Sequence, residues 1–75
     1  MEEYKAVIGS KLRELRGERS QEEVATALNV TVNAISQYET GKRIPNDPMK
    51  VKIARFFGMS VEDLFFTKEV SEMIT

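Results

Sequence analysis

Apolar residues recur at helical spacing in the first part of the chain. They are Tyr4, Ile8, Leu12 and Leu15. Steps of three and four residues place all of them on one face of a helix, so we expect an amphipathic helix over residues 4–16. Gly17 follows this segment, and glycine readily adopts the left-handed backbone with which many helices end.

The same periodicity returns after a short polar connection and predicts two shorter helices, over residues 21–28 and 32–40. Their apolar residues share an inner face: Val24, Ala25, Leu28, Val30, Ile35 and Tyr38. Residues 29–31 leave room only for a tight turn between the two helices. This layout is typical of a helix-turn-helix, whose second helix can enter the major groove of DNA.

Residues that favour helix ends support these boundaries. Ser20 and Glu23 form the S-x-x-E pattern that begins helices, and Thr31 is a suitable N-cap for the next helix. Asn29 tolerates a left-handed turn, and Gly41 provides the end of the second helix. Both helices of the pair therefore have a start signal and a stop signal.

A fourth helix is predicted over residues 48–57. Asp47 is the expected N-cap, Pro48 the first helical residue, and Gly58 the end. The inner face of this helix consists of Met49, Ile53, Ala54 and Phe57.

The rest of the chain predicts one further short helix, over residues 61–66, with Ser60 as N-cap. Residues 67–75 have no clear period, and three alternatives stay open for them: a helical extension, a strand at a dimer interface, or disorder. No segment alternates for long like a half-buried strand. We therefore predict an all-α fold, a compact bundle of five short helices in a single domain over residues 1–75.

The composition argues against several classes of function. The chain has 75 residues, with no Cys and no His. It shows no catalytic Ser–His pair, no phosphate-binding loop and no metal cluster, so we expect no enzyme, no cofactor, no metal and no small-molecule ligand. The charged start of the chain does not fit a signal peptide, and no apolar run reaches the ~20 residues that span a bilayer. We expect a cytoplasmic protein with no membrane partner.

Charge is distributed unevenly along the chain. The net charge is −1, but residues 5–55 carry ten Lys or Arg against six Asp or Glu. Residues 1–4 carry two acids, and residues 56–75 carry one Lys against four acids. Because phosphate contacts depend on local Lys and Arg, the basic middle of the chain is compatible with nucleic-acid binding. An ordinary surface with mixed charges has the same pattern, so charge alone does not decide whether the protein binds nucleic acid.

The outward face of the second helix of the pair carries Asn33, Ser36 and Gln37. Amide side chains can both donate to and accept from the edge of a base, and adenine is their best match. Polar residues on an exposed helix are otherwise merely solvated. Their position within a helix-turn-helix is what makes them candidate base-reading residues.

Four segments of the chain form a highly specific sequence pattern when taken together, although any one of them alone would be weak evidence. They are I-G-S-K-L-R-E-L-R, S-Q-E-E-V-A-T-A-L, V-T-V-N-A-I-S-Q-Y-E-T-G-K and K-I-A-R-F-F-G-M-S-V-E-D-L-F. Together they resemble the lambda-repressor-like (Cro/C1-type, XRE) helix-turn-helix family, over about residues 8–65. The resemblance implies a sequence-specific regulator of transcription that binds double-stranded DNA.

The resemblance also assigns roles to individual residues. Base edges would be contacted by Val32, Asn33, Ser36 and Gln37. Backbone phosphates would be held by Gln21, Thr31, Lys42 and Arg43. Arg16 and Glu39 match a pair that forms an internal salt bridge, with Glu39 turned toward the core.

Four features depart from the family pattern. The G-E-R-S connection at residues 17–20 is shorter than usual, and Asn29 stands where a turn glycine is common. Asp47 and Lys50 occupy positions that are often apolar. Val32 replaces a common polar residue; it can contact a thymine methyl group but cannot form a hydrogen bond. The operator sequence therefore cannot be copied from a relative.

The C-terminal part of the chain has more apolar residues than so small a domain can bury alone. We assign five of them to a two-fold interface: Phe65, Phe66, Val70, Met73 and Ile74. Phe66 is the best candidate. The sequence thus predicts a homodimeric repressor that binds an inverted repeat. The alternative is a regulator or antitoxin-like adaptor that binds a protein partner through this apolar C-terminus.

Overall fold

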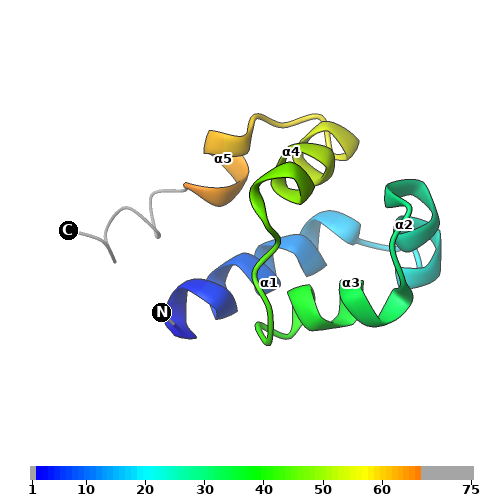
Figure 1. The fold of residues 1–75 in the computed structure, drawn as a ribbon, viewed down its shortest axis with the longest axis horizontal. Coiled ribbons are helices and arrows are strands. Elements are labelled where there is room, and N and C mark those ends of the chain that lie inside the picture. Colours follow the sequence, from blue (N-terminus) through cyan, green and yellow to red (C-terminus); the bar gives the residue numbers. More distant parts are fainter. Residues whose placement is uncertain (1, 67–75) are drawn as a thin grey trace.

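The computed structural model describes residues 2–66, which form five α-helices (Figure 1). They are α1 (Glu2–Arg16), α2 (Gln21–Leu28), α3 (Val32–Glu39), α4 (Asp47–Phe56) and α5 (Val61–Phe65). No strand occurs among these residues, so the predicted all-α fold is confirmed. None of the helices in this part of the chain is long and apolar enough to cross a lipid bilayer.

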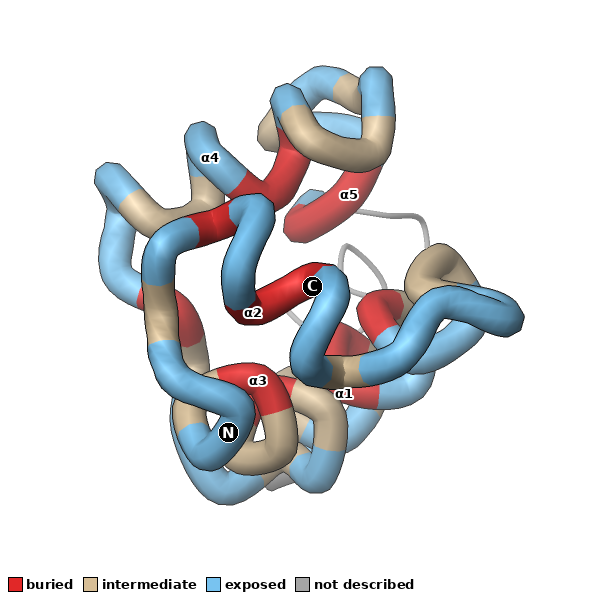
Figure 2. Tube along the Cα trace, turned by 90° about the vertical axis from the view of Figure 1, so that its right-hand side faces the viewer, coloured by how far each residue is buried: buried red, intermediate tan, exposed pale blue. Residues whose placement is uncertain are grey.

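The main contacts between the helices form a closed ring. α1 packs on α3, α3 on α2, α2 on α4, α4 on α5, and α5 on α1. The enclosed core draws residues from all five helices: Ile8, Leu12, Val24, Ala25, Leu28, Ile35, Tyr38, Ile53, Ala54, Leu64 and Phe65. Figure 2 shows these buried stretches on every helix, with exposed segments around them. Because each helix contributes to one core, burial depends on the whole ring rather than on any single pair.

Three helices begin with the side-chain caps that the sequence predicts. The hydroxyl oxygens of Ser20, Thr31 and Ser60 each accept a hydrogen bond from the backbone N–H three residues later, at 3.0, 3.1 and 3.0 Å. Each cap satisfies one of the N–H groups that a helix leaves unpaired at its start. These three predictions are confirmed.

The backbone is left-handed at four positions that follow helices. They are Gly17, Asn29, Gly41 and Gly58, with φ between +57° and +77°. Asn29 carries a side chain, and asparagine is one of the few such residues that tolerate this conformation. The predicted turn at Asn29 is therefore confirmed, without the glycine that is common there.

The predicted start of α4 is wrong by one residue. The N-cap is Asn46, whose side-chain oxygen accepts a hydrogen bond from the Met49 N–H at 2.9 Å. Asp47 is therefore the first helical residue and Pro48 the second. Asn46 and Asp47 are both good N-caps by residue type, and only the path of the backbone decides which side chain reaches a free N–H.

Other boundaries shift by one or two residues. α1 begins at Glu2 rather than at residue 4, while α3, α4 and α5 end one residue earlier than predicted. The charged residues at the start of α1 continue the helix without adding to its apolar stripe. Hydrophobic periodicity therefore could not mark where α1 begins.

The last two phenylalanines of the described chain differ in burial. Phe65 is 0% exposed and belongs to the core, so the prediction that it lies at a dimer interface is wrong. It is covered within the chain because α5 packs on both α4 and α1. Phe66, the next residue, is 50% exposed. The other expected interface residues, Val70, Met73 and Ile74, lie outside the described residues.

α1 and α3 come into direct backbone contact at Gly9. A Cβ atom at this position would lie 2.5 Å from the carbonyl oxygen of Glu39 and 2.8 Å from that of Tyr38, closer than Cβ atoms approach other atoms. Gly41 continues the contact, since its Cβ atom would lie 3.3 Å from the Lys5 backbone. The end of α3 thus lies against the backbone of α1.

We expect Gly9→Ala to lower the free energy of unfolding by about 1–3 kcal/mol, because the added methyl group must push α3 away from α1. The sign of this change distinguishes the close contact from helix propensity. Without the contact, alanine would stabilise the helix, since it is the better helix former by about 1 kcal/mol. Urea unfolding followed by circular dichroism measures the change. Ser10→Ala, at the exposed neighbouring position, is the control and should not destabilise the protein. Equal stability of Gly9→Ala and the wild type would contradict the close contact.

Candidate nucleic-acid interface

The turn between α2 and α3 is held by backbone hydrogen bonds. The left-handed residue Asn29 donates its N–H to the Thr26 carbonyl at 3.2 Å, and Val30 donates to the Ala25 carbonyl at 2.9 Å. These bonds satisfy carbonyl groups that α2 leaves free at its end. Thr31, the next residue, is the N-cap of α3. The orientation of α3 relative to α2 is therefore fixed by local sequence.

α3 has a buried side and an exposed side. Ile35 and Tyr38 are 4% and 5% exposed and face the core. The four residues predicted to read bases lie on the other side of the helix: Val32, Asn33, Ser36 and Gln37. Val32 is 43% exposed, Asn33 is exposed, and Ser36 and Gln37 are half-buried. The structure thus brings the four together on one accessible strip along α3.

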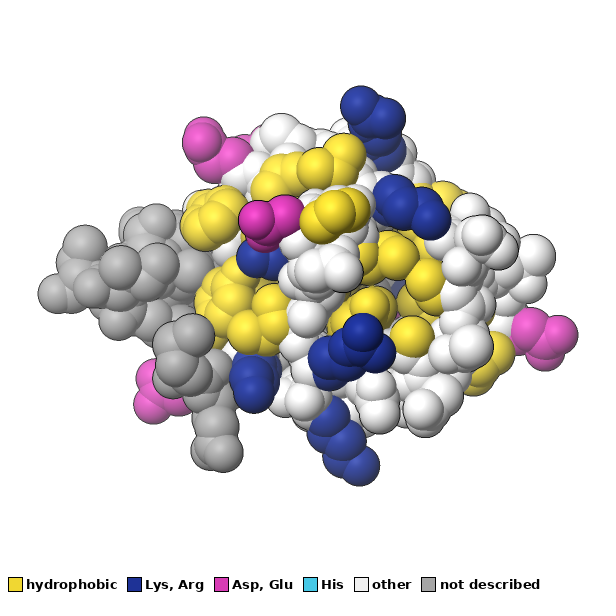
Figure 3. Space-filling view, in the orientation of Figure 1, with side chains coloured by type: hydrophobic (Ala, Val, Ile, Leu, Met, Phe, Trp, Pro, Cys, Tyr) yellow, Lys and Arg dark blue, Asp and Glu magenta, His cyan; other side chains and the backbone are white. Residues whose placement is uncertain are grey.

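Two basic residues, Lys42 and Arg43, lie just beyond the end of α3, after Thr40 and Gly41. The backbone N–H groups of Lys42 and Arg43 both donate to the Gln37 carbonyl, at 3.0 and 3.2 Å, and both side chains are exposed. The Arg43 guanidinium carbon lies 5.7 Å from the centre of the Tyr38 ring. Figure 3 shows Lys and Arg side chains projecting near the turn that follows α3. Positive charge is therefore available at the C-terminal end of the exposed strip.

The other two residues expected at phosphates have bonds inside the protein. The Thr31 hydroxyl caps α3, as described above. The Gln21 side-chain amide, at the first residue of α2, donates to Glu39 Oε1 at 3.1 Å. Gln21 thus links the start of α2 to the end of α3.

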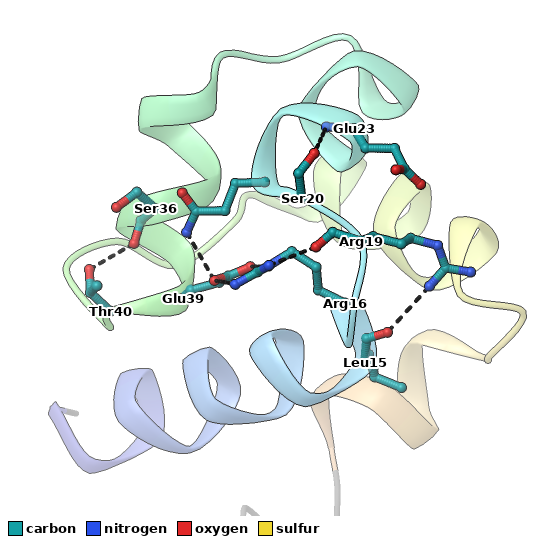
Figure 4. A network of polar contacts seen from close by, with 9 residues as sticks. Leu15, Arg16, Arg19, Ser20, Glu23, Ser36, Glu39 and Thr40 are labelled. Carbon is teal, nitrogen blue, oxygen red and sulfur yellow. Dashed lines mark hydrogen bonds and ion pairs between the residues drawn. The ribbon is translucent and has the colours of Figure 1, made fainter.

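Glu39 is the centre of a polar network that joins three helices (Figure 4). Its carboxylate accepts hydrogen bonds from Arg16 Nε at 2.7 Å and from Arg16 Nη2 at 3.1 Å, in addition to the bond from Gln21. The third guanidinium nitrogen of Arg16 donates to the Arg19 carbonyl at 2.7 Å. The Glu39 side chain is only 5% exposed, so this ion pair is largely shielded from water.

The hydrogen bond to Glu39 raises the pKa of Arg16, and this effect exceeds the opposing effect of burial. A raised folded-state pKa gives a contribution to stability that is present below the unfolded pKa and is lost only as the pH rises through the folded value. The guanidinium therefore stays charged at all physiological pH values. Protonation of Arg16 does not make the position of α3 depend on pH in that range.

Two further basic residues, Arg19 and Lys50, lie beside aromatic rings. The Arg19 guanidinium carbon lies 5.5 Å from the centre of the Phe56 ring, and Lys50 Nζ lies 5.7 Å and 5.8 Å from the rings of Phe65 and Phe66. Each contact joins residues that are far apart in the chain, or on two different helices. Periodicity within one helix carries no signal for such contacts.

Comparison with known proteins agrees with this geometry. The sequence model of the family described as helix-turn-helix matches residues 11–64, which include all of α2 and α3. The transcriptional repressor RstR of cryptic phage CTXphi, from Vibrio cholerae, is 36% identical over 67 residues. That match covers 87% of this chain and 60% of the repressor, so the chain spans three fifths of the length of this relative.

Two further curated relatives are similar over most of the chain. An uncharacterized helix-turn-helix transcriptional regulator of Bacillus subtilis, YgzD, is 32% identical over 62 residues, which are 80% of this chain and 94% of the regulator. Multiprotein-bridging factor 1 of Candida albicans is 34% identical over 56 residues, which are 72% of this chain and 37% of that protein. No solved structure gives a significant match to the chain.

We expect Glu39→Ala to destabilise the protein by about 2–3 kcal/mol, because it leaves the partly buried Arg16 guanidinium without its carboxylate. Urea unfolding measures the loss. The exposed Glu23→Ala is the matched control, and its cost should be at most about 1 kcal/mol. If both changes cost the same, the network around Glu39 does not hold α3.

Proposed function

Because the chain belongs to the XRE-type helix-turn-helix family of DNA-binding transcriptional regulators, we propose that it is a repressor that binds an inverted-repeat operator as a homodimer. The observation that carries the proposal is the two-sided α3. One side is fixed against α1 and α2, and the other side presents amide, hydroxyl and methyl groups to solvent. A helix anchored in this way fits the recognition helix of a helix-turn-helix.

In the proposed complex, α3 enters the major groove and its exposed strip reads the bases. Asn33 and Gln37 each bind an adenine through its N6 and N7 atoms, and such a bidentate contact contributes about 1–3 kcal/mol of discrimination. Val32 packs against a thymine methyl group, and Ser36 donates to or accepts from a neighbouring base edge. This strip therefore favours A·T pairs in each half-site.

The DNA backbone is held at both ends of the strip. Lys42 and Arg43 contact phosphates next to the C-terminal end of α3, and Thr31 contacts them at its N-terminal end. Gln21 adds a contact through the part of its amide that does not bind Glu39. These contacts position α3 in the groove but do not select a sequence.

A homodimer doubles this recognition surface. Two copies related by a two-fold axis present two α3 helices to half-sites about one helical turn apart, ~34 Å. Bound over a promoter, such a dimer represses transcription by blocking access of the polymerase. The similarity to a named phage repressor supports repression rather than activation.

Protein binding is the second candidate function. It is favoured by the exposed Phe66 at the end of α5 and by the similarity to a protein named multiprotein-bridging factor. In that function the same fold is an adaptor, and α5 with the following residues contacts a partner. DNA binding would then be weak, insensitive to sequence and lost as salt rises.

We expect Asn33→Ala to change which DNA sequences the protein selects, because it removes a contact with a base edge. Selection from random duplex DNA at two salt concentrations should give a motif that is relaxed at the corresponding position. Lys42→Ala is the control for a phosphate contact and should retain the wild-type motif. It should lower the affinity for all DNA sequences equally and reduce the slope of log K against log salt concentration by about one. An unchanged motif for Asn33→Ala would show that α3 does not read bases at this residue.

Two further variants separate DNA reading from assembly. We expect Gln37→Ala to weaken operator binding at least about tenfold while the oligomeric state stays the same, since the residue lies on the exposed strip of α3. Phe66→Ala should weaken self-association and leave the base preference of each half-site unchanged. Gel-shift titration and sedimentation velocity of both variants measure the two properties. A loss of both properties in both variants would contradict the proposed division of roles.

A further inference from the structure

Arg13 is an exposed basic residue in the last turn of α1, outside the helix-turn-helix. Residues three and four apart are neighbours on the surface of a helix, so Gly9 and Arg16 lie next to Arg13. Both neighbours contact the last residue of α3. A Cβ atom at Gly9 would lie 2.5 Å from the Glu39 carbonyl oxygen, and Arg16 Nε lies 2.7 Å from the Glu39 carboxylate. The Arg13 side chain therefore begins beside the C-terminal end of α3.

The rotation of α1 directs Arg13 past α3 rather than into the core. Each residue of an α-helix is rotated by about 100° from the one before it. Leu12 is buried in the core, and Gly9, which faces α3, lies about 60° around the helix from Leu12. Arg13 lies about 100° from Leu12 in the same direction. Its side chain therefore projects along the flank of α3, toward the side on which the exposed strip of α3 lies.

The charge of Arg13 has no partner within α1. A favourable ion pair along a helix needs an acid three or four residues away. The residues at those positions are Gly9, Ser10, Arg16 and Gly17. The one charge among them has the same sign, and the Arg13 guanidinium forms no ion pair with any other described residue. The Glu39 carboxylate already accepts hydrogen bonds from Arg16 and Gln21. An anion beside Arg13 would therefore meet a cation that no acid neutralises.

The end of α1 and the start of α2 lie on the same flank of α3. Only residues 17–20 separate the two helices, and the Glu39 carboxylate binds Arg16 at the end of α1 and Gln21 at the start of α2 (Figure 4). Gln21 is one of the residues proposed to hold a phosphate. A DNA strand whose phosphate is held by Gln21 therefore passes over this flank, where the exposed guanidinium of Arg13 also lies.

Arg55 provides a comparison within the same chain. A cation in the last turn of a helix is favourable in itself, because the C-terminal end of the helix dipole is negative. Arg55 is likewise exposed and lies in the last turn of α4, a helix that packs mainly on α2 and α5. The two arginines thus share their charge, their exposure and their place in a helix. They differ in the helix beside them, which is α3 only for Arg13.

We propose that Arg13 is a further phosphate-contacting residue, which extends the DNA-binding surface to α1. Its guanidinium donates two parallel hydrogen bonds to the DNA phosphate next to the one held by Gln21, a geometry for which arginine is well suited. Because α1 and α3 are joined at Gly9 and Glu39, a phosphate held on α1 also fixes the orientation of α3 in the groove. This inference rests on the proposed function and adds a contact to it.

Arg13→Gln removes the charge and keeps a polar side chain at an exposed position. We expect it to weaken binding to the selected duplex and to an unrelated duplex by the same factor, about tenfold at low salt, because phosphate contacts carry no base information. The slope of log K against log salt concentration should fall by about one, as for the loss of one phosphate contact. Arg13→Lys should retain the wild-type slope. Fluorescence anisotropy titrations at several salt concentrations measure both quantities.

Arg55→Gln is the matched control. It changes the net charge of the protein and the charge at a helix end in the same way as Arg13→Gln, but it should leave the salt slope unchanged. Circular dichroism establishes that each variant is folded.

A scan of the DNA phosphates identifies the contact itself. Each phosphate of the selected duplex is replaced in turn by an uncharged methylphosphonate. One replacement should weaken binding of the wild type but not weaken Arg13→Gln any further, because the contact is already absent from that variant. The replacement at the adjacent phosphate should behave in this way for Gln21→Ala. This pattern requires direct contact, and a change of net charge alone does not produce it.

The outcomes distinguish this inference from the proposed function. Equal salt slopes for Arg13→Gln and Arg55→Gln, or phosphate scans of the same shape for Arg13→Gln and the wild type, overturn the Arg13 contact and leave the proposed function in place. A wild-type chain that enriches no sequence contradicts the proposed repressor, while the salt slope on an unrelated duplex still tests the Arg13 contact. A wild-type chain that binds no duplex contradicts both.

Discussion

The direct backbone contact between α1 and α3 is the constraint on which the rest of this structure depends. At Gly9 the two helices are so close that even a methyl group has no place between them. At the C-terminal end of α1, Arg16 binds the carboxylate of Glu39, the last residue of α3. Gln21 then connects the same carboxylate to the start of α2. One short helix is thereby attached to two others through a single shielded side chain.

This attachment explains how α3 can present its opposite side to a ligand. A helix of eight residues is only marginally stable by itself, and most of its stability must come from packing. Ile35 and Tyr38 provide that packing from the inner side. The side chains of the exposed strip of α3 do not contribute to this packing, yet the helix holds them in one orientation. Preorganisation of this kind lowers the entropy lost on binding.

Much of this fold could be predicted from the sequence because its signals are local. Apolar spacing marked the first four helices, and Ser20, Thr31 and Ser60 marked three starts correctly. Two of the errors arose where adjacent residues are chemically similar: Asn46 and Asp47 at the start of α4, and Phe65 and Phe66 at the end of α5. Local patterns cannot tell which member of such a pair faces a free N–H group or the core. The surroundings of Lys50 depend on how α5 packs against α4, so they also needed the structure.

The proposed function requires that the exposed strip of α3 reads bases in the major groove. The most direct test is a titration of the ¹⁵N-labelled protein with the duplex that it selects, followed through the side-chain amide signals of Asn33 and Gln37. We expect these two signals to change most, together with the backbone amide of Val32. Base reading by α3 would be contradicted if these signals stayed unchanged at saturation while residues of α4 and α5 responded.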